Sequence, residues 1–398
     1  MSVAGLAPSG RIARLEPTAV NAILAEVREA RARGQNPVSL MRGEPDFPTP
    51  GHIVDAAARA LRDGRTSYPD NRGEPALRDA VAQKLRRENG LQYDAGSEIL
   101  VTTGATFGIW AALTAILEDG DEVLLPDPVY DAYQSPIRLA GGRARPVRAS
   151  RAGGRFAIGR EALEEAWTPA AKLLLLNTPW NPVGTVFTRD ELEQVAAFVE
   201  ARGLMLVSDE IYEAITYEGH GHLSPAAISP SLRARAILVN SFSKTYAMTG
   251  WRAGYCAGPK PWIDAMYLVL QQSSRGPATF IQDAATAALN GPRECVEAMR
   301  AEYERRRARV IDMLQDAGSA RVLPPEGGFF AMVDLGEGSP ASDQVRRRLL
   351  EEHGVVVAHG SAYGPGGEGT LRVSFASGGE NLERGLERLR DGLRRMAA

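Results

Sequence analysis

Cysteine is scarce in this sequence, with only Cys256 and Cys295 among 398 residues. Neither belongs to a Cys-x-x-Cys pair, so a zinc site is not indicated and a disulfide is not needed. The five histidines show no metal-ligand spacing either, and we interpret His220 and His222 as loop residues. We therefore expect no bound metal.

Long apolar runs and an excess of charge are also missing. No stretch approaches the length of a membrane span, and the N-terminus lacks the charged and apolar regions of a secretory signal. A net charge of −3 gives no reason to expect nucleic acid or an anionic membrane as a partner. The remaining composition is that of an ordinary globular chain, long enough for two domains. We expect a soluble cytoplasmic protein.

Five short apolar runs alternate with segments of helical periodicity, which is typical of a mostly parallel α/β sheet. The carboxyl ends of such strands lie at one edge, so we expect polar residues there to form a site. The basic stretch 143–151 is interpreted as a solvated loop, and the segments 327–333 and 370–375 as strands of a smaller layer. The five runs end at Thr102, Leu125, Leu176, Val207 and Val239.

The last of these runs leads into Ser-Phe-Ser-Lys-Thr-Tyr-Ala-Met-Thr-Gly-Trp-Arg, residues 241–252. A lysine in a small-residue turn at a strand end contributes little to stability, and a single such lysine is usually a surface residue. It suits carbonyl chemistry, however, because a desolvated lysine loses its proton and can form a Schiff base. The serines, glycines and arginine around Lys244 favour the chemical interpretation.

Residues 241–255 closely resemble the pyridoxal-phosphate lysine motif of class I/II aminotransferases, the fold-type I enzymes of the aspartate aminotransferase superfamily. The resemblance extends from about Leu15 to about Leu389. It implies a seven-stranded, mostly parallel sheet covered by helices, in a large domain of residues 49–289. Residues 1–48 and 290–398 would together form a smaller α+β domain.

The resemblance also implies how pyridoxal 5'-phosphate is bound. Lys244 would form an aldimine with it, Asp209 would keep its pyridine nitrogen protonated, and Tyr130 would stack on its ring. Tyr212 and Asn181 would hydrogen-bond its phenolic oxygen. The phosphate would be held by Gly104, Ala105, Thr106, Ser241 and Arg252, with Tyr68 from the other subunit of a homodimer. Independently of the resemblance, a strand followed by Gly-Ala-Thr and a helix directs N–H groups at an anion.

Arg372 lies in an alternating strand, where burying it without an anion would be costly. In the family that the chain resembles, this arginine clamps the substrate α-carboxylate, with Gly43 and Asn181 beside it. The family often has Pro-Gly where this chain has His359-Gly360. Because that loop is close to the substrate side, the departure bears on specificity.

The predicted reaction moves the amino group of an L-amino acid to a 2-oxo acid by a ping-pong mechanism. A carbon–sulfur lyase on the same scaffold stays open, because the ring, phosphate and lysine motifs are shared. A regulator with an aminotransferase-like domain is disfavoured, since about 40 residues before the Gly-Glu-Pro-Asp-Phe loop leave no room for a DNA-binding domain. A nicotinamide-dependent dehydrogenase is disfavoured because no Gly-x-Gly-x-x-Gly follows the first strand.

The substrate stays open at this stage. Dicarboxylate specificity needs a second cation near the side-chain pocket, and some aspartate aminotransferases of this subgroup carry a lysine where this chain has Thr106. Arg42 and Arg275 are possible substitutes, because the resemblance brings both of their loops near the active site. The simpler interpretation of each is a surface arginine.

Overall fold

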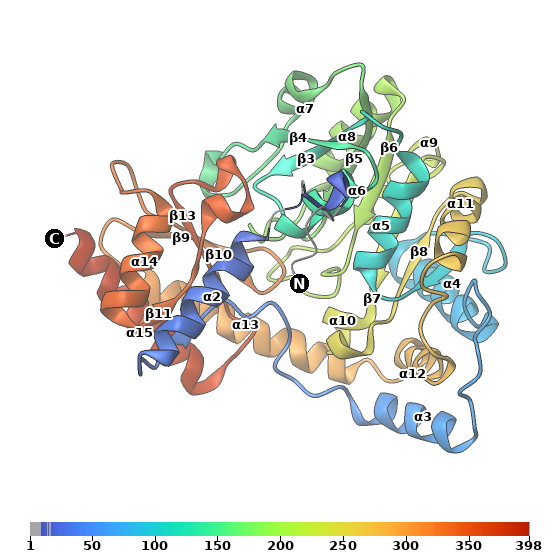
Figure 1. The fold of residues 1–398 in the computed structure, drawn as a ribbon, viewed down its shortest axis with the longest axis horizontal. Helices are drawn as coiled ribbons and strands as arrows, with labels where there is room; N and C mark the ends of the chain where they lie inside the picture. Colours follow the sequence, from blue (N-terminus) through green and yellow to red (C-terminus); the bar gives the residue numbers. More distant parts are fainter. Residues whose placement is uncertain (1–8, 14, 16, 398) are drawn as a thin grey trace, which may run out of the picture.

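A seven-stranded sheet organises most of the molecule (Figure 1). The computed structural model describes residues 9–13, 15 and 17–397, and the strands follow the order β2-β8-β7-β6-β5-β3-β4. β8 is antiparallel to both of its neighbours, and the other four pairings are parallel, so the predicted mostly parallel sheet is confirmed. The strands are β2 (Ile99–Thr102), β3 (Glu122–Asp127), β4 (Arg143–Arg148), β5 (Ala171–Asn177), β6 (Met205–Asp209), β7 (Ala236–Ser241) and β8 (Gly254–Ala257).

Helices cover both faces of this sheet, and each face has its own hydrophobic core. The strands β5, β6 and β7 therefore carry uninterrupted buried apolar runs, as parallel strands between two helical layers do. One face carries α5 (Ala105–Ile116), α6 (Gln134–Leu139) and α11 (Lys260–Gln271). The other carries α4 (Pro75–Asn89), α7 (Arg160–Ala166), α8 (Arg189–Arg202) and α12 (Thr279–Asn290), with α3 (Gly51–Arg62) packed on α12.

A second, smaller layer lies on the left of Figure 1. It holds a four-stranded antiparallel sheet in the order β12-β13-β10-β9 and the parallel pair β1–β11, which confirms the predicted smaller α+β layer. Its strands are β1 (Val38–Ser39), β9 (Arg321–Leu323), β10 (Phe330–Asp334), β11 (Val355–Val356), β12 (Ala358–His359) and β13 (Thr370–Ser374). Its helices are α2 (Ala19–Ala32), α13 (Glu294–Leu314), α14 (Ser342–His353) and α15 (Gly379–Ala397).

The prediction of a loop over residues 143–151 is wrong, because this stretch begins with strand β4. β4 pairs in parallel with β3 along its whole length, and Val147 is fully buried. Arg143 and Arg148 are exposed, which suits an edge strand, since charged side chains protect such an edge from further pairing. An edge strand needs no continuous apolar run, so the basic composition concealed it.

Two residues expected at the surface are buried instead. A run of arginines at helical spacing, such as that of α13, usually forms a solvated face. Arg306 of this run is nevertheless 8% exposed and forms an ion pair with Asp46 at 2.9 Å. His222 lies in a loop as predicted, yet its Nε2 atom is 2.8 Å from Glu210 Oε2 and its ring is buried. The sequence around each residue carries no sign of these distant or buried partners.

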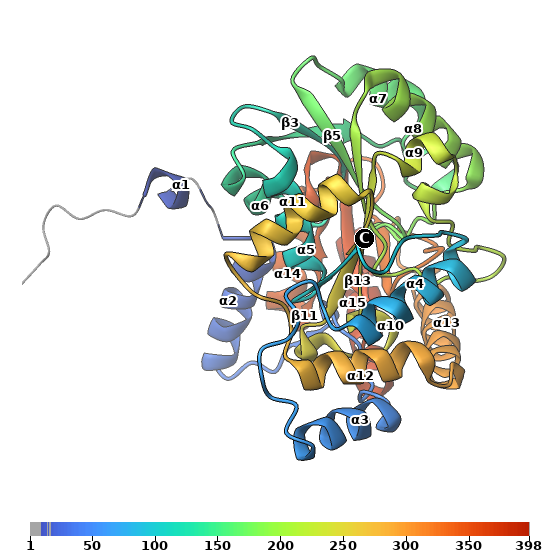
Figure 2. The ribbon, with the colours of Figure 1, turned by 90° about the vertical axis from the view of Figure 1, so that its right-hand side faces the viewer.

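The N-terminal segment reaches the smaller layer through α2. α2 begins after Thr18, whose hydroxyl accepts a hydrogen bond from Asn21 N at 3.3 Å, and Ile23 and Val27 face the core. The short helix α1 (Gly10–Ala13) stands apart from the body in Figure 2. The predicted loose arm covers residues 1 to about 14, most of which lie outside the described residues.

Candidate active site

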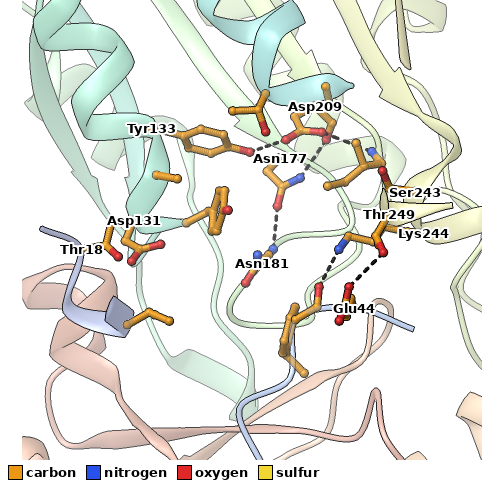
Figure 3. A pocket seen from close by; sticks show the side chains of 18 of the residues that line it. Thr18, Glu44, Asp131, Tyr133, Asn177, Asn181, Asp209, Ser243, Lys244 and Thr249 are labelled. Atoms are coloured by element: carbon orange, nitrogen blue, oxygen red, sulfur yellow. Dashed lines mark hydrogen bonds between the residues drawn. The ribbon is translucent and has the colours of Figure 1, made fainter. Parts of the chain in front are cut away.

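A cavity of about 680 Å³ lies at the carboxyl ends of the large sheet's strands, facing the smaller layer. Its walls come from β5, β6 and β7, from β10 and β13 of the smaller sheet, from the start of α2, and from the loop after β1. Figure 3 shows this lining from close by. The predicted gathering of strand-end residues therefore occurs, as expected for an open α/β sheet.

Lys244 enters the cavity from a single helical turn that follows β7. Ser241 caps this turn, α10 (Phe242–Thr245), by accepting a hydrogen bond from Ser243 N at 3.3 Å. Phe242 and Thr245 are buried in the core, which turns the lysine toward the cavity. Its Nζ donates a hydrogen bond to the carbonyl oxygen of Gly43 at 2.6 Å (Figure 3).

The surroundings of Lys244 favour its neutral amine. Burial is the main cause that lowers the pKa of Lys244 to about 8; Glu44 opposes this shift and the positive charge of Arg252 contributes to it. Glu44 belongs to the loop after β1 and accepts a hydrogen bond from Thr249 at 2.9 Å. A reactive amine is therefore available near neutral pH, which an exposed lysine does not provide.

Asp209, the last residue of β6, forms one wall of the cavity and is 2% exposed. Its Oδ2 accepts a hydrogen bond from Tyr133 Oη at 2.5 Å, and its Oδ1 accepts from Ile211 N at 3.3 Å. Burial raises the pKa of Asp209 to about 6, and the bond from Tyr133 opposes that shift. At neutral pH the group is a buried, oriented carboxylate that can hold a protonated nitrogen.

Arg252 and the start of α5 form an anion cradle. Gly104 precedes the helix with φ +84°, and no side chain caps its first N–H groups. A Cβ on Gly104 would lie 2.7 Å from Arg252 Nη2, so only glycine admits the guanidinium here. Arg252 donates to the carbonyl oxygen of Thr249 at 3.0 Å and forms no ion pair with the described part of the chain. Uncapped helix N–H groups beside a free guanidinium suit a phosphate.

Arg372 of β13 is 4% exposed and lies in the same cavity without a carboxylate partner among the described residues. Its guanidinium makes two long hydrogen bonds, to Asn181 Oδ1 at 3.4 Å and to the carbonyl oxygen of Met41 at 3.5 Å. Its Nε makes none. The guanidinium also stacks on Phe330, with Cζ 4.1 Å from the ring centroid. A buried cation with unfilled donors requires an anionic ligand.

Comparison with known proteins identifies this arrangement. A family model described as "Aminotransferase class I and II" matches residues 35–389. The chain belongs to this family. It is therefore an aminotransferase, and enzymes of this family use pyridoxal phosphate.

Named relatives of this aminotransferase differ in substrate. It is 38% identical to an aspartate aminotransferase of Geobacillus stearothermophilus, over 95% of this chain and 97% of that one. It is 39% identical to aromatic-amino-acid aminotransferase 2 of Thermococcus litoralis, over 88% and 90% of the two chains. The solved structure of Thermus thermophilus aspartate aminotransferase with maleate is 38% identical and superimposes with a TM-score of 0.91, covering 97% of this chain and 100% of that one. These names favour the aminotransferase over the lyase.

Most residues predicted for the site of this aminotransferase do line the cavity. Gly104 stands behind Arg252, outside the lining itself, and Tyr68 lies elsewhere, 84% exposed beside Arg275 in a separate hollow. The predicted residues in the lining are Gly43, Ala105, Thr106, Tyr130, Asn181, Asp209, Tyr212, Ser241, Lys244, Arg252 and Arg372.

The two loop features linked to specificity are also located. Arg42 lines the cavity, but it pairs with Glu44 at 3.5 Å, whereas Arg275 does not reach the cavity in this chain. His359 points away from the cavity, with Nδ1 2.8 Å from Ser361 Oγ. The His-Gly departure from the family pattern therefore lies outside the residues that line the cavity of this aminotransferase.

Tyr133, Asn177 and Asp131 are among the polar residues of the lining that sequence reasoning missed. Tyr133 binds Asp209, and Asn177 accepts from Asn181 N at 2.7 Å while donating to the Asp209 carbonyl oxygen at 2.9 Å. Asp131 lies between Tyr130 and Tyr133 in the same short segment. Their nearness in sequence to predicted residues, one to four positions away, was the available signal.

The helices can also be compared with the length and hydrophobicity that a membrane span requires. Among the described residues, each helix is too short or too polar to cross a bilayer.

Proposed function

We propose that this chain transfers the amino group of an L-amino acid to a 2-oxo acid with pyridoxal 5'-phosphate held in the cavity around Lys244. The observation that carries the proposal is the convergence, in one cavity, of a half-buried lysine of lowered pKa, a buried carboxylate and two guanidinium groups without carboxylate partners. No other set of groups in the described part of the chain combines these features.

The residues present fit the cofactor. The cradle of Arg252, Ala105 and Thr106, with the Ser241 hydroxyl, would hold its phosphate, and the close packing of the Arg252 guanidinium against Gly104 at the start of α5 supports this assignment. Asp209 would hold the ring nitrogen. Tyr130 would flank the ring, and Tyr212 with Asn181 would donate to its phenolic oxygen. When bound, pyridoxal phosphate supplies a carbonyl carbon for amines and a ring that accepts electrons.

The chain's own groups would bind the substrate and move its protons. Arg372 would pair with the α-carboxylate, with Asn181 and the Gly43 backbone beside it. The Lys244 amine, neutral in part at pH 7 and fully above its pKa, would accept the proton from the substrate Cα. Asp209, ionised above pH 6, would keep a positive charge on the nitrogen it faces.

Homodimerisation belongs to the same proposal. Tyr68 is far too exposed for a tyrosine that only fills a core, and its hollow, about 600 Å³, shares no lining residue with the cavity around Lys244. In a homodimer with shared sites, Tyr68 would reach the phosphate in the partner subunit. We also propose that residues 49–289 form the large domain, and that residues 1–48 with 290–398 form the small one.

A cytoplasmic location completes the proposal. Cys256 and Cys295 are both free, which suits a reducing compartment. The substrates would be small amino acids and 2-oxo acids. The aspartate and aromatic-amino-acid aminotransferases named above are almost equally similar to this chain, so their names do not select the substrate.

The test is the absorbance spectrum of the purified protein with added amino acids, one at a time and without an oxo acid. Lasting conversion of the cofactor from its aldehyde form to its amine form supports the proposal, and the fastest converter names the donor class. Ammonia release with a persistent aldehyde form would instead show a lyase. Failure to take up added pyridoxal phosphate would refute the assignment of the cavity.

A further inference from the structure

A carboxylate with one unfilled oxygen lies in the cavity wall opposite Lys244 (Figure 3). Asp131 begins the 3-10 turn η1 (Asp131–Tyr133), directly after Tyr130. Its Oδ2 is closed off from solvent and accepts no hydrogen bond from the described residues. The hydroxyl of Thr18, at the start of α2, is the side-chain group that lies beside the carboxylate. A buried acceptor left empty costs free energy unless a ligand fills it.

Asp131 and Arg372 are opposite charges in one cavity, yet they do not pair. Arg372 donates hydrogen bonds to Asn181 and to the Met41 carbonyl oxygen, while Asp131 lies beside Thr18. Each keeps one unfilled polar atom, Nε in the arginine and Oδ2 in the aspartate. A ligand that fills both must carry an anion at one position and a hydrogen-bond donor at another.

The other cationic side chains of the cavity already have a partner or a proposed role in binding the cofactor. Arg42 pairs with Glu44 at 3.5 Å and donates to the Pro45 carbonyl oxygen at 3.3 Å. Lys244 and Arg252 serve the cofactor in the proposed function. Within the described lining, these residues and Arg372 are the only lysines and arginines. A second substrate carboxylate would therefore meet Asp131 rather than a free cation.

We propose that Asp131 selects substrates whose side chain ends in an N–H donor, such as an amide, and disfavours side chains that end in a carboxylate. The inference rests on the proposed function, which puts the substrate carboxylate at Arg372 and its amine at Lys244. An amide would donate to Oδ2, whereas a carboxylate would face a like charge in a partly dry cavity. Aspartate would then be a poor donor, although several relatives are named for it.

The isosteric pairs asparagine/aspartate and glutamine/glutamate test this inference. In the half-reaction of the cofactor-loaded enzyme, each amide should react at least about tenfold faster than its acid, since tenfold corresponds to about 1.4 kcal/mol. Asp131→Asn keeps the shape and removes the charge, so it should reduce the ratio by about tenfold or more. Asp55→Asn, exposed on α3, is the matched control and should leave the ratio unchanged.

A second readout needs no turnover. Calorimetry should show succinamate binding the loaded enzyme more tightly than succinate, with the difference lost in Asp131→Asn. A wild-type preference for the acids, or a ratio that ignores Asp131→Asn in both assays, would overturn the inference. If no amino acid converts the cofactor but binding still follows Asp131, the proposed transamination fails and the inference about the pocket stands.

Discussion

Asp209 and Glu210 are adjacent in sequence at the end of β6, but they belong to two different clusters of buried charged residues. Asp209 faces the cavity, while Glu210 belongs to a polar network on the other side of the strand. We define this network by Lys84, Asn89, Glu210, Glu213 and His222, with the donors Ser208, Ser224 and Asn240.

The two carboxylates of the network have hydrogen-bond partners, whereas the charged groups of the cavity keep unfilled atoms. Glu210 accepts from Ser208 and Ser224 at 2.8 and 2.9 Å, and Glu213 accepts from Lys84, from Asn240 at 2.7 Å and from Asn89 at 2.9 Å. The ligand atoms of Glu210, Glu213 and His222 lie within 4.8 Å of one another, a spacing that would suit a metal ion. Because donors and Lys84 already engage both carboxylates, we interpret the group as structural.

This difference separates charges that hold the fold from charges reserved for ligands. A buried ion pair with complete hydrogen bonding is costly to break, because the remaining partner is left uncompensated. An unpaired buried charge, such as that of Arg372, contributes little to the stability of the fold and is available to bind a ligand. Substitutions in the two groups should therefore separate stability from activity.

The largest effect is expected at Lys244. Lys244→Ala should lower turnover at least about 10⁴-fold, the upper end of what a positioned general base contributes. The cofactor-free protein should unfold at an unchanged or higher temperature, because burial disfavours the ammonium and no carboxylate among the described residues forms an ion pair with it. Lys260→Ala, which removes an exposed i,i+4 pair with Asp264, is the control for both measurements. Retention of a tenth of the turnover would contradict the assignment.

The next effect concerns Arg372. Arg372→Met should lower kcat/KM by about 10²- to 10³-fold, since losing one partner of a buried charge pair costs roughly 2–5 kcal/mol. Arg372→Lys should recover only part of this loss, because an ammonium cannot make the bidentate contact. Steady-state kinetics and thermal unfolding check both variants. A large loss of stability with unchanged kcat/KM would move Arg372 into the structural class.

Substitutions in the polar network should lower stability and leave activity nearly unchanged, the opposite of what is expected at Lys244 and Arg372. Burial would raise the pKa of Glu213, but the interactions with Lys84, His222 and Asn89 together outweigh burial and lower the pKa, so they stabilise the fold at neutral pH. Glu213→Gln should reduce the free energy of unfolding by about 3–5 kcal/mol with kcat within about twofold. The double variant Lys84→Met/Glu213→Met should recover part of that loss. Denaturant titration at pH 7 measures these differences, and a further fall in the double variant would refute the pairing.

The smallest effect is a shift in pH dependence. The rate at which cofactor-free protein captures pyridoxal phosphate should rise with pH through about 8, because only the neutral Lys244 amine is nucleophilic. Glu44 is the carboxylate that most raises this pKa, so Glu44→Gln should move the midpoint to lower pH. Glu29→Gln, exposed on α2, is the control. A midpoint near 10.5, or an upward shift in Glu44→Gln, would contradict the proposed environment.

Much of the fold was predictable because its signals are local. The apolar runs that became β2, β5, β6 and β7 needed no knowledge of the rest of the chain, and the motif around Lys244 is contiguous. β4 was missed because an edge strand carries one buried position in a basic stretch. The bond from Tyr133 to Asp209 joins residues 76 positions apart, and the pair of Arg306 with Asp46 joins residues 260 apart. No local pattern encodes such contacts.

The site divides in the same way. Residues within recognisable motifs, such as Arg252 and Arg372, were named from the sequence, and the structure brings them into one cavity. Asp131 belongs to no recognisable motif. Its proposed role in substrate selection depends on the tertiary structure, which leaves its Oδ2 atom and the Nε atom of Arg372 without hydrogen-bond partners. The role assigned to Tyr68 concerns a second subunit, so it stays a prediction.

The cavity wall is assembled from residues as distant in sequence as Thr18 and Arg372. A partly synthesised or partly folded chain therefore carries Lys244 but lacks the wall around it, and its lysine keeps the basicity of an ordinary surface amine. Contacts of this range form late, because their loops must close first. Cofactor binding would then require the fully folded chain, and the absorbance of the bound cofactor would report the fraction of molecules that have completed folding.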